Sequence, residues 1–201
     1  MNKEQQLIYK KFISKYNFNG DQKEQLRLGL ENELDVSWYA NPEFNERQMI
    51  EIRKGLYSGV DVSLYAKPVF DCLQMEEIKL GLEENLDASL YAKPELSHLQ
   101  MFQIKVGLED KLDVSLYASP DFNEGQMKEI RKGLAKRINV SLYARSEFNS
   151  LQMQQIRLGL QERINVSDYL NPSIDYKEID EIRSNLKNEK LEAGIKFRSS
   201  I

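Results

Sequence analysis

Apolar residues recur at spacings of three and four along most of the chain, and the same arrangement returns every 26 residues. In one stretch the apolar positions are Met75, Ile78 and Leu82, and three periods later they are Met153, Ile156 and Leu160. This spacing is typical of the buried face of an amphipathic α-helix. A Gly-Leu pair marks the same point of each period, at Gly29, Gly55, Gly81, Gly107, Gly133 and Gly159. The pattern therefore predicts a chain built from tandem helical repeats.

The repeats follow one another without insertions. The first copy covers residues 18–43, the second covers 44–69, and the sixth ends at residue 173. A degenerate seventh copy runs from residue 174 toward the C-terminus, and residues 1–17 are predicted to form an N-terminal cap helix. We interpret residues 1–201 as a single solenoid domain, with 18–173 as six full repeats and 174–201 as the seventh repeat and C-terminal cap.

Each repeat is predicted to contain one long and one short helix. A residue such as Asn45, followed three positions later by Gln48, forms the capping-box pattern of a helix start. The long helix is expected to span about 14 residues, since it stops near Leu86 and Asp87 in the third copy. Asp87 is then placed to cap the short helix, and Pro94 ends it.

An isolated helix pair of this size cannot bury its apolar face, whereas stacked copies share a continuous core. The sequence therefore predicts an all-α protein, a right-handed α-solenoid of about seven two-helix repeats with terminal caps. Glycine in mid-helix costs about 1 kcal/mol relative to alanine, so we expect each Gly to allow close approach of a neighbouring helix backbone. Two further recurring sets are expected in the core, the tyrosines Tyr39, Tyr65, Tyr91, Tyr117, Tyr143 and Tyr169 and the methionines Met49, Met75, Met101, Met127 and Met153.

Composition narrows the function. Lys and Arg total 28 against 32 Asp and Glu, giving a formal net charge of −4. A negative net charge argues against a protein that coats nucleic acid, and four charges over 201 residues are too dilute for a nucleic-acid mimic. Cys72 is the only cysteine and His98 the only histidine, so the chain cannot form an internal disulfide or a Cys/His zinc site. These two residues are expected to lie about 10 Å apart on neighbouring helices, too far for Cys–His catalysis.

Other classes of function lack their motifs as well. No phosphate-binding loop, dinucleotide motif or metal motif is found, so we expect no enzyme, no cofactor and no metal. The N-terminal stretch is too polar for a signal peptide, and no run of apolar residues could span a membrane. We therefore expect a cytoplasmic protein without a membrane partner.

The repeat motif carries a resemblance. It reads QMEEIKLGLEENLDASLYAKP over residues 74–94 and QMFQIKVGLEDKLDVSLYASP over residues 100–120. This motif resembles a tandem repeat found in proteins of phages and conjugative elements of Gram-positive gut bacteria, and the likeness extends over residues 18–173. The resemblance implies a mobile-element origin but no reaction, ligand or catalytic residue. Small proteins of that origin often bind and block a host protein, including nucleic-acid-targeting defence systems of the CRISPR type.

One basic position recurs in every long helix, and we call these residues the basic ladder: Arg27, Arg53, Lys79, Lys105, Arg131, Arg157 and Arg183. Cations along a solenoid could follow a phosphate backbone. Alternatively, each cation pairs with a nearby carboxylate, for which Asp61, Asp87 and Asp113 are candidates. We favour pairing, because a solenoid that reads one base per repeat would vary this position.

Positions that differ between copies carry the more specific signal. On the face of the long helix away from Ile78, the third, fourth and sixth copies place apolar residues, namely Leu73, Leu80, Leu99, Phe102, Val106, Leu151 and Leu158. The second and fifth copies have Arg47, Lys54, Gly125 and Lys132 instead. Such residues either form an exposed interaction surface or are covered by the short helices.

These patterns lead to two hypotheses. The first is a non-catalytic module that binds another protein, with Leu73, Leu99 and Phe102 as anchors, Leu80 and Val106 beside them, and Glu76, Glu77 and Lys105 at the rim. A host defence nucleoprotein complex is the expected partner, and a second copy of the chain is another, since similar copies recur 78 residues apart. The second hypothesis is a nucleic-acid-binding solenoid that uses Arg53, Lys79, Lys105, Arg131 and Arg157.

Overall fold

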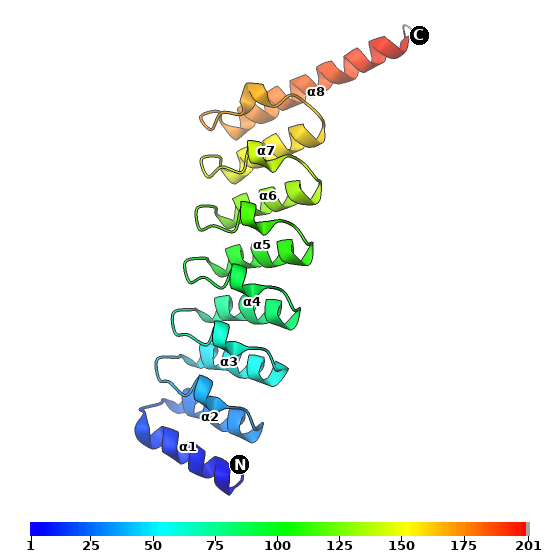
Figure 1. Ribbon diagram of the computed structural model, residues 1–201. Coiled ribbons are helices and arrows are strands. Elements are labelled where there is room, and N and C mark those ends of the chain that lie inside the picture. Colours follow the sequence, from blue (N-terminus) through cyan, green and yellow to red (C-terminus); the bar gives the residue numbers. More distant parts are fainter. Residues whose placement is uncertain (200–201) are drawn as a thin grey trace. The chain divides into compact units, whose positions relative to one another are not determined.

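The computed structural model describes the backbone of residues 1–199 and the side chains of residues 1–193. Over this range the chain is all-helical and repetitive, as in an α-solenoid of repeats (Figure 1). The contacts divide the chain into two compact units, Met1–Lys105 and Val106–Ile201. In the first unit α1 packs on α2, α2 on α3 and α3 on α4. In the second unit α6 packs on α7 and α7 on α8.

The long helices are α1 (Lys3–Lys15), α2 (Gly20–Glu31), α3 (Glu46–Ser58), α4 (Cys72–Glu83), α5 (His98–Glu109), α6 (Glu124–Ala135), α7 (Ser150–Gln161) and α8 (Tyr176–Ser199). The short helices are single 3₁₀ turns, η1 (Val36–Trp38), η2 (Val62–Leu64), η3 (Ala88–Leu90), η4 (Val114–Leu116), η5 (Val140–Leu142) and η6 (Ser167–Tyr169). The two-helix repeat is therefore confirmed in six copies. The seventh copy consists of α8, a continuous helix of 24 residues that no 3₁₀ turn follows in the described range.

The long helices begin as predicted and end earlier. In α3 the side chain of Asn45 accepts a hydrogen bond from the backbone N–H of Gln48, and Gln48 reciprocates. The third repeat's helix was predicted to reach Leu86, but α4 ends at Glu83. Asn85 adopts a left-handed conformation with φ of 58°, and the N–H of Leu86 bonds back to the carbonyl of Gly81. This helix-terminating turn reverses the chain before the predicted end.

The glycine of each long helix makes room for a tyrosine side chain. A Cβ atom added at Gly55 would lie 1.8 Å from the hydroxyl oxygen of Tyr65, and the same holds for Gly81 and Tyr91. The prediction that glycine admits a neighbouring helix backbone was therefore wrong. The close partner is the tyrosine that follows the 3₁₀ turn of the same repeat, and its hydroxyl group occupies the space that a Cβ would need.

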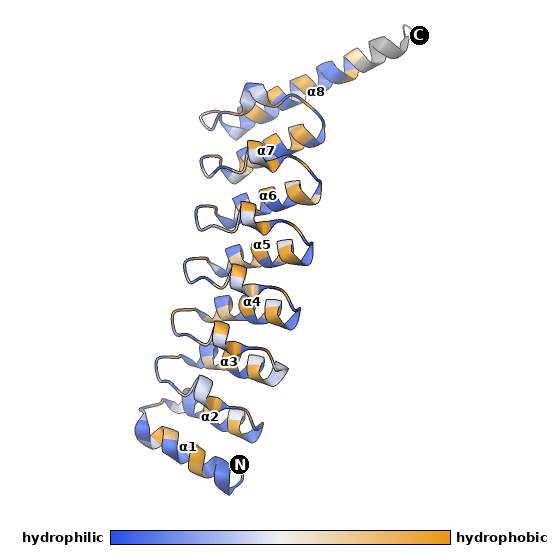
Figure 2. Ribbon diagram, viewed as in Figure 1, coloured by the Kyte–Doolittle hydropathy of each residue, from blue (hydrophilic) through white to orange (hydrophobic). Residues whose placement is uncertain are grey.

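The tyrosines and methionines form the core, as predicted. All six recurring tyrosines and all five recurring methionines have no exposed surface. The hydroxyl of Tyr39 donates to the backbone carbonyl of Gln25 at 3.2 Å, and Tyr143 bonds to the carbonyl of Glu129 at the same distance. Burial raises the pKa of Tyr39 and Tyr143 well above the ordinary value, so these hydroxyls remain protonated donors. Figure 2 shows that apolar and polar residues are interleaved within the individual long helices.

The capping-box glutamines also join one repeat to the next. While Oε1 of Gln48 accepts a hydrogen bond from its own helix cap, Nε2 donates to the carbonyls of Pro68 and Phe70 at 3.1 and 2.7 Å. The same pair of bonds recurs at Gln22, Gln74, Gln126 and Gln152. A glutamate could cap the helix but has no N–H to donate. The one glutamate at this position is Glu178 of α8, after which the described residues contain no 3₁₀ turn.

Candidate functional site

The three predicted anchors are exposed. The side chains of Leu73, Leu99 and Phe102 are 44%, 46% and 40% exposed, whereas the core residues of the same helices, such as Met75 and Met101, have no exposed surface. Leu73 lies in the first turn of α4, and Leu99 and Phe102 lie in the first half of α5. The 3₁₀ turns therefore do not cover these residues. They form a set of apolar side chains in the first unit.

The other residues of the predicted surface are less exposed. Leu80, at the C-terminal half of α4, is half-buried, as are Glu76 and Glu77. Val106 is also half-buried and belongs to the second unit. In that unit Leu151 is 44% exposed and Leu158 is half-buried. Within the first unit, the exposed apolar anchors are thus confined to the N-terminal halves of α4 and α5.

A cation lies against the aromatic anchor Phe102. The ammonium group of Lys105 lies 5.7 Å from the centroid of the Phe102 ring, within cation–π range. Lys105 is itself buried, and together with Glu77 it takes part in further interactions. The rim of an interface is solvent-accessible, so the prediction of Lys105 as a rim residue was wrong, and the partly exposed charges are those of Glu76 and Glu77 on the same helix as Leu73.

Sequence reasoning missed a second set of exposed apolar residues on the 3₁₀ turns. Trp38, Leu90 and Leu116 occupy equivalent positions of their repeats and are 40–45% exposed. The signal was present in the sequence, since the residue before each recurring tyrosine is Trp or Leu in five copies and Asp168 in the sixth. The short helix was predicted only to pack between repeats, so the residue before the tyrosine was not predicted to be exposed.

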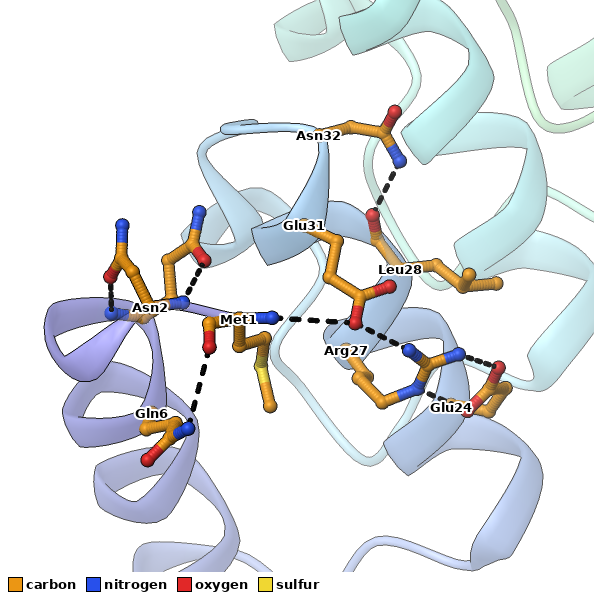
Figure 3. A network of polar contacts seen from close by, with 9 residues as sticks. Met1, Asn2, Gln6, Glu24, Arg27, Leu28, Glu31 and Asn32 are labelled. Carbon is orange, nitrogen blue, oxygen red and sulfur yellow. Dashed lines mark hydrogen bonds and ion pairs between the residues drawn. The ribbon is translucent and has the colours of Figure 1, made fainter.

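The basic ladder is largely paired with acidic groups. Figure 3 shows the guanidinium group of Arg27 between the carboxylates of Glu24 and Glu31, at 2.6 and 2.5 Å. The second-unit members Arg131 and Arg183 pair with Asp110 and with Glu162, at 3.7 and 2.8 Å. This pairing leaves little unbalanced positive charge for a phosphate backbone.

Two of the ladder's ion pairs are buried and connect neighbouring long helices. Lys79 on α4 binds Glu51 on α3 at 2.8 Å, and Arg157 on α7 binds Glu129 on α6 at 2.7 Å. Burial by itself raises the pKa of Glu51, but hydrogen bonds from Lys54 and Lys79 outweigh burial and hold that pKa below its ordinary value. These cations therefore hold repeats together.

The acids that pair with the ladder are not the ones expected. Asp61, Asp87 and Asp113 instead accept hydrogen bonds from the backbone N–H of Ser63, Ser89 and Ser115, two residues on, and so cap the 3₁₀ turns. The recurring inter-repeat partner lies 28 residues before the cation and is Glu or Gln, depending on the copy.

The single cysteine and the single histidine occupy equivalent positions of adjacent repeats. Cys72 and His98 are the first residues of α4 and α5 and are both half-buried. In the part of the chain that the structure describes, no three His, Cys, Asp or Glu side chains are grouped to hold a metal ion. Among the described helices, none combines the length and apolar character needed to cross a membrane.

Comparison with known proteins adds no relative. No family model matches the chain, and no curated protein and no solved structure matches it either.

Proposed function

We propose that the protein is a non-catalytic helical-repeat module that binds another protein through Leu73, Leu99 and Phe102. The observation that carries this proposal is the exposure of all three side chains on long helices whose core-facing residues, such as Ile78 and Ile104, have no exposed surface. Exposed, clustered apolar residues with charged neighbours are a common mark of interaction surfaces. Leu73 and Leu99 occupy equivalent positions of adjacent repeats, while the preceding repeat has Arg47 there, so stacking does not require leucine.

The mechanism would be steric. In the first unit the hydrogen bonds of Gln48 and Gln74 and the buried ion pair between Lys79 and Glu51 join neighbouring repeats, so the exposed residues lie on interconnected helices. Such a surface can cover the working site of a partner without chemistry. The repeat motif's resemblance to proteins of phages and conjugative elements leads us to propose a host defence effector as the partner and inhibition as the outcome.

A nucleic-acid-binding solenoid is the less favoured alternative. The ladder would need unpaired cations, whereas Arg27, Lys79, Arg131, Arg157 and Arg183 all have carboxylate partners. Neutralised cations release few counterions from nucleic acid and so contribute little to affinity.

The test is capture from lysate of a Gram-positive gut bacterium, with bound material quantified by mass spectrometry. The wild type is compared with the double variant Leu99→Glu and Phe102→Glu. A matched control, Leu151→Glu with Gln154→Glu, adds the same charges at the equivalent positions of α7. Circular dichroism establishes that all three proteins are helical.

We expect the wild type and the control to capture the same protein. The α5 variant should capture at least tenfold less of it, and a tenfold loss of affinity corresponds to about 1.4 kcal/mol of binding free energy. Capture that is equal in all three and is lost on nuclease treatment would refute the proposal, and would make the basic ladder the binding element.

A further inference from the structure

A pocket of about 390 Å³ lies over α2, α3 and α4 in the first unit. It is lined by Asn32 at the end of α2, by Arg53, Lys54, Tyr57 and Ser58 of α3, and by Lys79 and Glu83 of α4. Three of these side chains are cations. Lys54 and Lys79 share one carboxylate, that of Glu51, and Ser58 donates a hydrogen bond to Glu83. The third cation, Arg53, is the unusual member.

Arg53 differs from other members of the basic ladder because its partner is neutral. Its Nε donates to Oε1 of Gln25 at 3.1 Å. Among the described residues Arg53 forms no ion pair, and its Nη1 and Nη2 make no hydrogen bond to protein. A guanidinium group has five N–H donors, so four remain available to a ligand.

The sequence explains why this one cation lacks an acid. Other ladder members pair with carboxylates at four sequence positions, which lie 28, 21 and three residues before the cation and four residues after it. The carboxylates at these positions are, in the same order, Glu51 and Glu129, Asp110 and Glu162, Glu24 and Asp180, and Glu31. Around Arg53 the same four positions are occupied by Gln25, Asn32, Ile50 and Tyr57. Every acid that neutralises a ladder cation elsewhere is replaced here by an uncharged residue.

Tyr57 adds a second feature to the pocket. It is 73% exposed, and the equivalent residue of the other full repeats is Glu31, Glu83, Glu109, Ala135 or Gln161. An aromatic ring that solvent can reach on the wall of a cationic pocket offers a face on which a planar group can stack. The pocket is also larger than inorganic phosphate requires and lies in the size range of small-ligand sites.

We propose that this pocket binds a phosphate monoester that carries an aromatic ring, with the phosphate on the guanidinium group of Arg53 and the ring against Tyr57. Arginine suits phosphate because its planar fork donates two parallel hydrogen bonds. Lys54 and Lys79 already share the carboxylate of Glu51, so Arg53 is the cation that is left to bind the phosphate. The pocket contains neither Leu99 nor Phe102, so the test of phosphate binding is independent of the test of the proposed protein-binding surface.

Calorimetric titration at constant ionic strength tests the site with two probes, inorganic phosphate and adenosine 5′-monophosphate. The wild type is expected to bind the nucleotide about tenfold more tightly than phosphate, and Tyr57→Ala is expected to remove that difference. Arg53→Gln should weaken both probes by at least tenfold. Arg27→Gln, which removes an arginine already held by two glutamates, should leave both affinities unchanged.

A second variant keeps the test independent of folding. Gln25→Glu places a carboxylate beside Arg53, as Glu51 lies beside Lys79, so it should abolish phosphate binding while maintaining or raising the melting temperature. Undiminished nucleotide binding in Gln25→Glu, or no saturable binding of either probe to the wild type, would overturn the proposal. Equal affinity for the two probes would overturn the assignment of an aromatic ester.

Discussion

The fit between glycine and tyrosine gives the sharpest prediction about the repeat. Replacing Gly81 by alanine would bring a Cβ atom to 1.8 Å from the hydroxyl oxygen of Tyr91 and to 3.1 Å from its Cζ. The third repeat is the favourable place for this test. It has Ala88 where other repeats have valine, so the only short contacts of the new Cβ are with the tyrosine.

The change in the free energy of unfolding of Gly81→Ala is the sum of a favourable and an unfavourable contribution. In an open helix, glycine to alanine gains about 1 kcal/mol. At residue 81 the methyl must displace a fully buried tyrosine ring, and overpacking of this kind costs about 1–3 kcal/mol, with a further 1 kcal/mol or so for the lost hydroxyl bond to Glu77. We therefore expect Gly81→Ala to lower the free energy of unfolding by about 2 kcal/mol.

A double-mutant cycle isolates the contact. Tyr91→Phe alone removes the hydroxyl and should cost about 1 kcal/mol. On the phenylalanine background, Gly81→Ala should be neutral or stabilising, which gives a coupling free energy of about 2 kcal/mol from urea unfolding followed by circular dichroism.

A matched pair in the second unit provides the control. The Cβ of Gly133→Ala also meets Cγ1 of Val140 at 2.7 Å, so Tyr143→Phe should rescue that variant less well. Additive effects of Gly81→Ala and Tyr91→Phe would refute the reasoning, because they would mean that the two side chains do not compete for one space.

Three further predictions concern the polar contacts. Gln48→Glu should lower the free energy of unfolding, measured in urea, by about 1–3 kcal/mol, because a carboxylate would face two carbonyl oxygens that now accept hydrogen bonds. Glu178→Gln should change this free energy by less than about 0.5 kcal/mol. Tyr143→Phe should cost about 1 kcal/mol, but Tyr169→Phe should be near neutral, since the buried hydroxyl of Tyr169 has no hydrogen-bond partner among the described residues; equal costs would contradict this. The pKa of Glu51 is lowered on folding, so its contribution to stability is present above the unfolded-state pKa of about 4.3 and is lost as the pH falls through the folded-state pKa. Thermal melts should therefore show a weaker loss of stability below about pH 4.5 in Glu51→Gln than in the wild type.

Local structure was predictable where a repeated residue has one local role. Asn45 and Gln48 formed the capping box that their spacing indicated, and Met75 and Tyr91 are buried as predicted. Such features depend on residues within one helix turn or on the period of apolar positions, and both can be read from the chain. Seven copies of one pattern made this evidence strong.

Contacts between repeats were harder to predict, because they join residues 20 to 28 positions apart whose approach depends on the stacking geometry. The sequence suggested Asp61 as a partner for the ladder, yet Asp61 caps a 3₁₀ turn, and the actual partner of Lys79 is Glu51. The second role of Gln48 was missed for the same reason. Its signal lies in the contrast between the six recurring glutamines and Glu178, because a glutamate has no N–H to donate.

The candidate surface was only partly predictable. Periodicity placed Leu99 and Phe102 away from the core, but their exposure depends on whether the 3₁₀ turns reach over them, which the sequence does not encode locally. Trp38 and Leu90 were assigned no surface role, although they are exposed to a similar degree.

Site-specific photo-crosslinking in host cells tests the proposed function most directly. A photoreactive phenylalanine analogue is placed at residue 102, and at the equivalent residue 154 of α7 as the matched control. If Leu73, Leu99 and Phe102 bind a protein, one crosslinked protein is expected from residue 102 and is absent from residue 154. Crosslinks that are the same from both positions, or that are to nucleic acid, would contradict the proposed function.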